Sequence, residues 1–250
     1  MGSFYITLPD NASQGLFRNN TRGNYKVKLP REINLSDRYE VGLASFFYTH
    51  SWKNVVGGYI TINDGGKVIR FQVPSGYYED EKRLILKINE LLDYYTRGNE
   101  VVSVKRKVHI KYDDITRLVN VIIETEDYFM IEFDGQLSQL LGVPKLITRT
   151  FEAYKPVNVS SGLNTFYIYC DIVEYSIVGN HSAPLLRLVN VRGNDNQSIS
   201  ESYDNPQYKS LLKRTFDTVE IDIKSDLNET VPFDYGKVIV TLHFRLKRLA

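Results

Sequence analysis

The sequence predicts an all-β protein: a single jelly-roll β-sandwich with one inserted amphipathic helix and a short helical turn. Most apolar segments alternate with a period of two, which is typical of strands with one buried and one solvated face. Only two segments have a helical period, which disfavours the regular strand–helix alternation of a parallel α/β sheet. The 250 residues are 42% hydrophobic, enough for a large core, and sandwiches of this length commonly form one domain. We therefore expect one jelly-roll domain over residues 1–250.

The first half of the chain carries five expected strands and a hairpin turn. Asn63-Asp64-Gly65-Gly66 joins two of these strands, because Gly and Asp tolerate the positive φ that tight hairpin turns require. The expected strands cover residues 4–9, 24–30, 39–48, 58–63 and 67–73.

Two segments are expected to be helical. Residues 79–96 form the helical insertion, since apolar residues recur every three or four positions and give one stripe; Gly98 follows as a stop signal. The stripe consists of Leu84, Ile85, Ile88, Leu91, Leu92 and Tyr95. A shorter helical turn over residues 137–141 ends at Gly142.

The second half again reads as strands. In residues 102–112, valine, isoleucine and tyrosine alternate with basic and polar residues, which predicts one long strand. Two stretches rich in Asn, Asp and Ser, residues 192–205 and 225–230, are expected to be the least ordered. The other expected strands cover residues 117–124, 128–133, 166–171, 185–191, 219–223 and 237–245.

Charge and cysteine content narrow the class of protein. The 31 basic and 30 acidic residues give a net charge of +1, which argues against a protein that binds nucleic acid through an overall basic excess. The single cysteine, Cys170, cannot form an intramolecular disulfide, which fits synthesis in an intracellular, reducing compartment. The N-terminus lacks the features of a signal peptide, and no apolar run approaches the ~20 residues of a membrane span. We expect a protein that is not secreted and has no membrane span.

No catalytic constellation stands out. The four histidines, at positions 50, 109, 181 and 243, are scattered without metal-ligand spacing. Carboxylates at residues 113–114 and 124–127 could bind calcium, but solvated turns explain them better. Cys170 lies in an apolar strand without a basic neighbour to lower its pKa, which favours a core residue over a nucleophile. The sequence therefore predicts no enzyme, no cofactor and no metal.

An ordered set of segments at the two ends of the chain resembles a known family, the penton-type minor capsid proteins of Polinton/Maverick elements and their adintovirus relatives. Each segment is a strand or turn, so the specificity lies in their order, and residues 97–164 match loosely. The segments are residues 4–9, 24–30, 39–44, 166–171, 184–187, 203–208, 216–223, 231–236 and 237–245.

The resemblance implies a structural protein of the virion without chemistry of its own. Its members are expected to be single jelly-roll subunits that form homopentamers at the five-fold vertices of an icosahedral virus or virus-like transposon capsid, beside a double-jelly-roll major capsid protein. Compared with larger vertex proteins of related viruses, this chain is expected to lack room for a large inserted domain, which argues against receptor binding through such an insert.

A second function class stays open: a monomeric β-sandwich module that binds a glycan or a receptor. Exposed aromatic residues lining a groove would favour it, and the candidates are Tyr77 with Tyr78, and Phe47 and Tyr48 with Trp52.

The resemblance assigns candidate roles in the fold or in ring contacts to Asn205, Pro206, Tyr208, Phe216 and Lys237. Pro206 fixes φ and biases Asn205 to an extended conformation, so this segment is expected to be a stiff bend that positions two tyrosines. A buried corner of the sandwich explains the same residues.

Charged strands supply the remaining candidates. Glu220 and Asp222 face away from the buried side of their strand, whereas Lys105, Lys107 and Lys111 form a basic stripe on another. In a head-to-tail ring, acidic and basic strands of neighbouring subunits would fix the register. The basic stripe is also a candidate contact for an acidic surface or packaged nucleic acid, but a solvated sheet face explains it better.

The C-terminus gathers Arg245, Lys247 and Arg248 among apolar residues. It is a candidate contact for neighbouring capsid proteins or packaged DNA, and the alternative is a strand that ends in a frayed basic tail.

Overall fold

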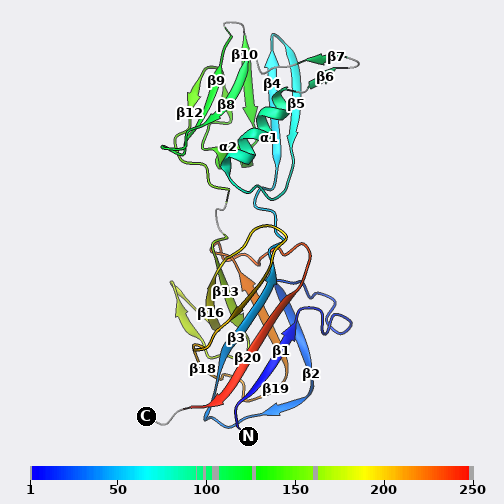
Figure 1. Cartoon of the computed structure of the whole chain (residues 1–250), viewed down its shortest axis with the longest axis vertical. Coiled ribbons are helices and arrows are strands. Elements are labelled where there is room, and N and C mark those ends of the chain that lie inside the picture. Colours follow the sequence, from blue (N-terminus) through cyan, green and yellow to red (C-terminus); the bar gives the residue numbers. More distant parts are fainter. Residues whose placement is uncertain are drawn as a thin grey trace. The chain divides into compact units, whose positions relative to one another are not determined.

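The computed structural model describes residues 2–93, 95–97, 100–102, 107–125, 128–159 and 163–247. The chain forms two compact units (Figure 1). The sandwich unit consists of Met1–Trp52 and Gly162–Ala250, and the inserted unit is Lys53–Ser161. Each has its own hydrophobic core. The expectation that the chain has no room for a large inserted domain was therefore wrong, because strands from the loosely matching middle bury their apolar faces against one another.

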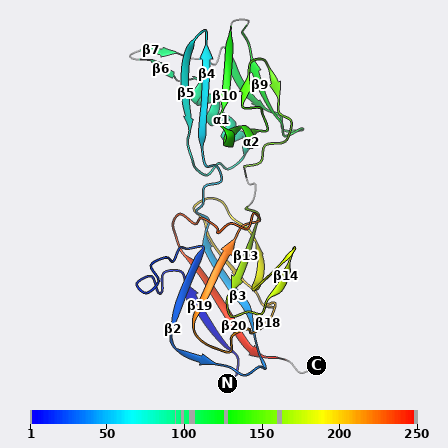
Figure 2. The ribbon, with the colours of Figure 1, turned by 180° about the vertical axis from the view of Figure 1, so that it is seen from behind.

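The sandwich unit contains two antiparallel four-stranded sheets, the first with an additional short strand. The first sheet has the order β1-β20-β3-β17 and the second has the order β16-β13-β19-β2 (Figures 1 and 2). Its main strands are β1 (Phe4–Pro9), β2 (Asn24–Asn34), β3 (Tyr39–Thr49), β13 (Thr165–Cys170), β16 (Leu185–Asn190), β17 (Ser198–Ser202), β19 (Thr215–Lys224) and β20 (Val238–Leu246).

The strand order identifies a jelly roll. When these eight strands are counted in chain order, the sheets run 1-8-3-6 and 2-7-4-5, which is the double Greek-key winding of that fold. The inserted unit enters between the third and fourth of these strands. The predicted all-β fold class with two helices is confirmed.

The predicted alternation explains how the two sheets pack. On β20, the side chains of Val238, Val240, Leu242 and Phe244 are fully buried, whereas the residues between them face outward. Aromatic rings fill the region between the sheets, with edge-to-face contacts that centre on Phe166. Burial of these side chains is the main source of stability in a unit without a disulfide.

Three smaller strands complete the sandwich unit. β18 (Lys209–Ser210) pairs with β3, and β14 (Ser176–Val178) pairs with β15 (His181–Ala183) as a separate hairpin. The expectation that residues 192–205 are least ordered was wrong over β17, which pairs with β3 along five residues. Its serines face outward while Ile199 packs against the core, so the polar composition concealed a strand.

The inserted unit combines two small sheets with both helices. One sheet has the order β11-β10-β4-β5 and the other β12-β9-β8, while β6 pairs with β7. The elements are β4 (Gly58–Asp64), β5 (Lys67–Val73), α1 (Glu81–Asp93), β6 (Tyr95–Arg97), β7 (Glu100–Val102), β8 (Val108–Tyr112), β9 (Val119–Ile123), β10 (Phe129–Phe133), α2 (Gly135–Leu141), β11 (Leu146–Ile147) and β12 (Phe151–Glu152).

Helix α1 confirms the predicted amphipathic helix over Glu81–Asp93, whereas Tyr95, a predicted member of its apolar stripe, belongs to strand β6. The carboxylate of Asp80 accepts a hydrogen bond from the backbone N–H of Arg83 at 2.8 Å and caps the first turn. The buried face, which includes Leu84 and Ile88, belongs to the core of the inserted unit. The helix is thus one element of a larger insertion. The predicted strand over residues 102–112 is realised as β8 from Val108, and residues 103–106 lie outside the described residues.

Candidate subunit-contact surface

The bend over residues 203–208, which we call the strap, lies on the outer face of the first sheet of the sandwich. The backbone N–H of Tyr203 donates to the carbonyl of Ala44 on β3 at 2.8 Å. Pro206 and Gln207 pack directly over Gly42, where a Cβ atom would lie 2.9 Å from the Pro206 Cβ and 3.1 Å from the Gln207 carbonyl oxygen. Only glycine at position 42 lets the strap approach the sheet this closely.

The strap is fastened by contacts of Tyr208 with β20. The Tyr208 hydroxyl lies 2.7 Å from Nδ1 of His243, and the Arg245 guanidinium lies 3.4 Å from the centroid of the Tyr208 ring. Nε of Arg245 also donates to the Glu40 carboxylate at 2.7 Å. On the other side of His243, the Tyr5 ring stacks with a centroid separation of 4.5 Å. The five side chains form a continuous network over β1, β3 and β20.

The electrostatics of this network favour a neutral His243. Partial burial lowers the pKa of His243, and the positive charge of Arg245 lowers it further. A neutral imidazole can accept the hydrogen bond from the Tyr208 hydroxyl at Nδ1, whereas a protonated one cannot.

The candidate residues of the resemblance take different positions. Pro206 and Tyr208 are half-buried in the strap, whereas Asn205 is exposed. Phe216 is buried and stacks on Phe244 at 6.1 Å, which makes it a core residue. Lys237 is exposed, and its carbonyl accepts a hydrogen bond from Thr49 next to the start of β20. The strap therefore contains Asn205, Pro206 and Tyr208, whereas Phe216 and Lys237 lie elsewhere in the sandwich unit.

The second sheet presents a charged outer face. Glu220 lies 3.2 Å from Nζ of Lys26, and Asp222 lies 3.8 Å from Nζ of Lys224. Both predicted acidic residues thus have basic partners within the same chain, and both pairs remain partly exposed.

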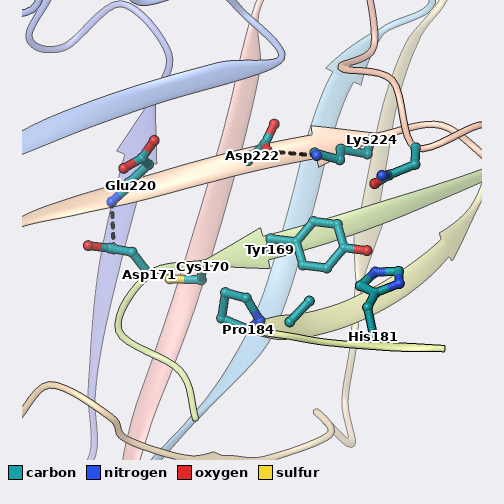
Figure 3. A pocket seen from close by; sticks show the side chains of 10 residues that line it. Tyr169, Cys170, Asp171, His181, Pro184, Glu220, Asp222 and Lys224 are labelled. Carbon is teal, nitrogen blue, oxygen red and sulfur yellow. Dashed lines mark hydrogen bonds and ion pairs between the residues drawn. The ribbon is translucent and has the colours of Figure 1, made fainter. Parts of the chain in front are cut away.

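A pocket of about 320 Å³ opens on this face next to the β14–β15 hairpin (Figure 3). Asp171 accepts a hydrogen bond from the backbone N–H of Glu220 at 2.8 Å. His181 reaches the pocket from the hairpin and lies beside Tyr169 in Figure 3. Burial raises the pKa of the Cys170 thiol to about 12, which disfavours the thiolate that nucleophilic chemistry needs. Within the described part of the chain, no group of His, Cys, Asp or Glu residues is placed to hold a metal ion.

The predicted basic stripe lies in the inserted unit. Nζ of Lys107 lies 2.9 and 3.0 Å from the two carboxylate oxygens of Asp64, so its charge is paired within the unit. Lys111 is exposed on β8, and Lys105 lies outside the described residues. The carboxylate of Asp113, a calcium candidate in the sequence, accepts hydrogen bonds from the backbone N–H groups of Ile115 and Thr116 and so closes a turn.

The basic residues of the C-terminus likewise differ in their contacts. Arg245 is engaged by Glu40 and Tyr208, while the backbone N–H of Lys247 donates to the Arg38 carbonyl at 2.6 Å. Arg248 lies outside the described residues. In the described part of the chain, no helix has the length and apolar character of a membrane span.

The aromatic residues that would have favoured a glycan site are mostly internal. Tyr48 and Trp52 are buried in the sandwich core, and Phe47 alone of that group lies on the outer face of β3. Tyr78 packs against the core of the inserted unit, and its hydroxyl donates to the Pro74 carbonyl at 2.9 Å. Tyr48 and Trp52 are therefore not available to line a surface groove.

Besides strand β17, sequence reasoning missed the β14–β15 hairpin and a groove of about 700 Å³ along β1 and β2. The Gly179-Asn180 pair next to Ile177 and Val178 is a turn signal that could have located the hairpin. The groove forms where the edge strands of the two sheets meet, so no local sequence pattern predicts it.

Comparisons with known proteins give structural neighbours only. No family model and no curated protein matches the sequence. The crystal structure of the mavirus penton protein is 13% identical, with a TM-score of 0.48, and the match covers 98% of this chain and 99% of that one. A chain in the 3.5 Å cryo-EM structure of the Sputnik virophage is 10% identical, with a TM-score of 0.48, and the match covers 99% and 98%. Both viral chains are thus similar to this one along nearly their whole length.

Proposed function

We propose that the chain is a structural minor capsid protein of the penton type, which forms pentamers at the five-fold vertices of an icosahedral virus or virus-like transposon capsid. The observation that carries this proposal is the location of the family-like segments. All of them fall in the sandwich unit, where they supply strands of the jelly roll and the strap, whereas the loosely matching middle falls largely in the inserted unit. The family-like segments thus contribute to every main strand of this sandwich except β17.

The proposal includes the partners of such a subunit. It contacts copies of itself in the ring and a double-jelly-roll major capsid protein around it, and Lys247 and Arg248 remain candidates for contact with packaged DNA. The protein is made in the host cell and resides at the capsid vertex. The free energy of assembly comes from apolar burial between subunits, because the charged pairs of the second sheet are already formed within one chain.

The inserted unit suggests an added role for the subunit at the vertex. An insertion of this size between the third and fourth strands provides a second folded body on each subunit. We propose that it supplies contacts beyond the ring, such as recognition of a receptor or of another capsid component.

Electron microscopy of the concentrated protein tests the proposed function. Class averages of rings with five-fold symmetry are expected. Particles of single-subunit size at every concentration, or rings of another symmetry, would contradict the proposal.

A further inference from the structure

The groove along β1 and β2 offers an uncovered sheet edge. It has a volume of about 700 Å³, and its lining includes apolar side chains from both strands. Those side chains are Phe4, Ile6, Val27, Leu29 and Ile33. Within the described residues, β1 pairs with β20 on one side and with no strand on the other. An edge of this kind is a template for a strand from another chain.

The neighbouring edge of β2 is partly protected, in contrast to that of β1. The backbone N–H of Lys26 donates to the Asn20 side chain and that of Lys28 to the Ser13 hydroxyl, both at 3.0 Å, so the loop after β1 covers this part of the strand. Pro30, further along, has no N–H to offer. Residues 26–30 of β2 are therefore closed to pairing, whereas β1, within the described residues, has an outer edge without a strand partner.

The β14–β15 hairpin has the features that would fill such a groove: strands without further partners and exposed apolar side chains. Its strands pair with each other and with no other strand among the described residues, and an isolated two-stranded hairpin is marginally stable in water. Ile177 is 87% exposed and Tyr175 is 59% exposed. A projecting hairpin with large exposed apolar side chains has the features of a docking element.

The hairpin and the groove lie at opposite edges of the sandwich. The hairpin connects β13 to β16, and β16 is the edge strand of the second sheet farthest from β2. Figures 1 and 2 show this separation from both sides, with the hairpin at one margin of the sandwich unit and β1 and β2 at the other. A knob and a groove on opposite edges produce a head-to-tail contact, which closes into a ring when the rotation permits.

The charges of the two elements do not oppose such a contact. Asp171, which precedes the hairpin, is already paired with Lys213, and Lys28 in the groove is already paired with Asp217. The other charged residues of the groove, Arg31 and Glu32, have opposite signs. Apolar contact, rather than a difference in charge, therefore favours the hairpin as the occupant.

From these observations we infer that the β14–β15 hairpin of one copy docks in the β1–β2 groove of the next, adding to the free edge of β1 and placing Ile177 against the apolar lining. This contact rests on the proposed function, since it names the interface that joins neighbouring subunits of the ring.

Substitution of Ile177 is the first test. Ile177→Asp is expected to leave the fold intact, because the side chain is exposed in the single chain, and to lower the association constant of each contact at least about tenfold. The matched control is Ile115→Asp, at a residue that is 94% exposed in a turn of the inserted unit. Native mass spectrometry is expected to show rings for the wild type and the control, and monomers for Ile177→Asp with an unchanged Tm.

Cysteine cross-linking gives an independent readout. A chain with both Ile177→Cys and Ile6→Cys is expected to form a disulfide-linked ladder up to the ring size, whereas each single variant and the pair Ile115→Cys with Ile6→Cys do not. Rings that persist in Ile177→Asp, together with no ladder, would overturn the hairpin contact and leave the proposed function standing. A wild type that stays monomeric, together with no ladder from the double-cysteine variant, would overturn both.

Discussion

The hydroxyl of Tyr208 lies 2.7 Å from Nδ1 of His243, and this contact ties the strap to the last strand of the chain. Tyr208→Phe removes the hydrogen bond while the ring stays beneath Arg245. The free energy of unfolding is expected to fall by about 1 kcal/mol, the typical net value of such a bond. Urea denaturation measures the loss. In the control, Tyr5→Phe, the ring stays stacked on His243 and stability should remain within about 0.5 kcal/mol.

The same contact makes stability depend on pH. Burial lowers the pKa of both His243 and His50 from the usual 6.5, so the unfolded chain binds protons on these residues at a higher pH than the folded chain does. Their contribution is therefore fully present above about pH 7 and is lost as the pH falls through 6.5. Unfolding by urea between pH 7.5 and pH 5 is expected to show this decline, with a smaller slope in His243→Gln. An equal slope in the two proteins would exclude His243 as a source.

Gly42 is expected to tolerate no side chain beneath the strap. A Cβ at this position lies 2.9 Å from Cβ of Pro206, so Gly42→Ala should displace the strap and lower stability by about 1–3 kcal/mol. Thermal unfolding measures the change. Gly15→Ala is the control, because a Cβ there meets nothing within 4 Å. Equal Tm values for both variants would show that the strap is not held against the sheet.

Much of the fold could be predicted because the signals are local. Period-two alternation located the long strands such as β3 and β20, and the spacing of Leu84 and Ile88 located α1. The division into two units could not be read in this way. Which strands share a core depends on contacts between distant parts of the chain, and the apolar faces of the sandwich and inserted units look alike in sequence.

The candidate site shows the same limit. The bend at Pro206 was predictable because proline fixes φ. Its packing over Gly42 and the hydrogen bond between Tyr208 and His243 were not, because both are long-range contacts. The acidic residue Glu220 was correctly placed on the solvated face of its strand, yet its partner Lys26 lies on the neighbouring strand of the same sheet.

A charge swap distinguishes a role for Glu220 within the chain from a role between subunits. Because the pair with Lys26 is partly exposed, Glu220→Lys should cost about 1 kcal/mol or less in stability. The double variant Lys26→Glu with Glu220→Lys restores the pair within the chain. If Glu220 contacts a neighbour, assembly measured by sedimentation remains impaired in the double variant. Full recovery would confine Glu220 to its own subunit.

Cys170 is expected to be chemically silent in the folded protein. Its side chain is buried and its pKa is raised to about 12, so the thiolate is scarce and inaccessible at pH 8. A thiol reagent such as DTNB should not react with the native protein and should titrate one thiol in denaturant. Rapid native labelling would show that the strand around Cys170 opens readily.

The most direct test of the central claim is the mass of the protein in solution, measured by native mass spectrometry over a range of concentrations. A pentameric vertex subunit predicts a species near five times 28.9 kDa that grows with concentration. A monomer at every concentration, or an assembly with another number of subunits, would contradict it.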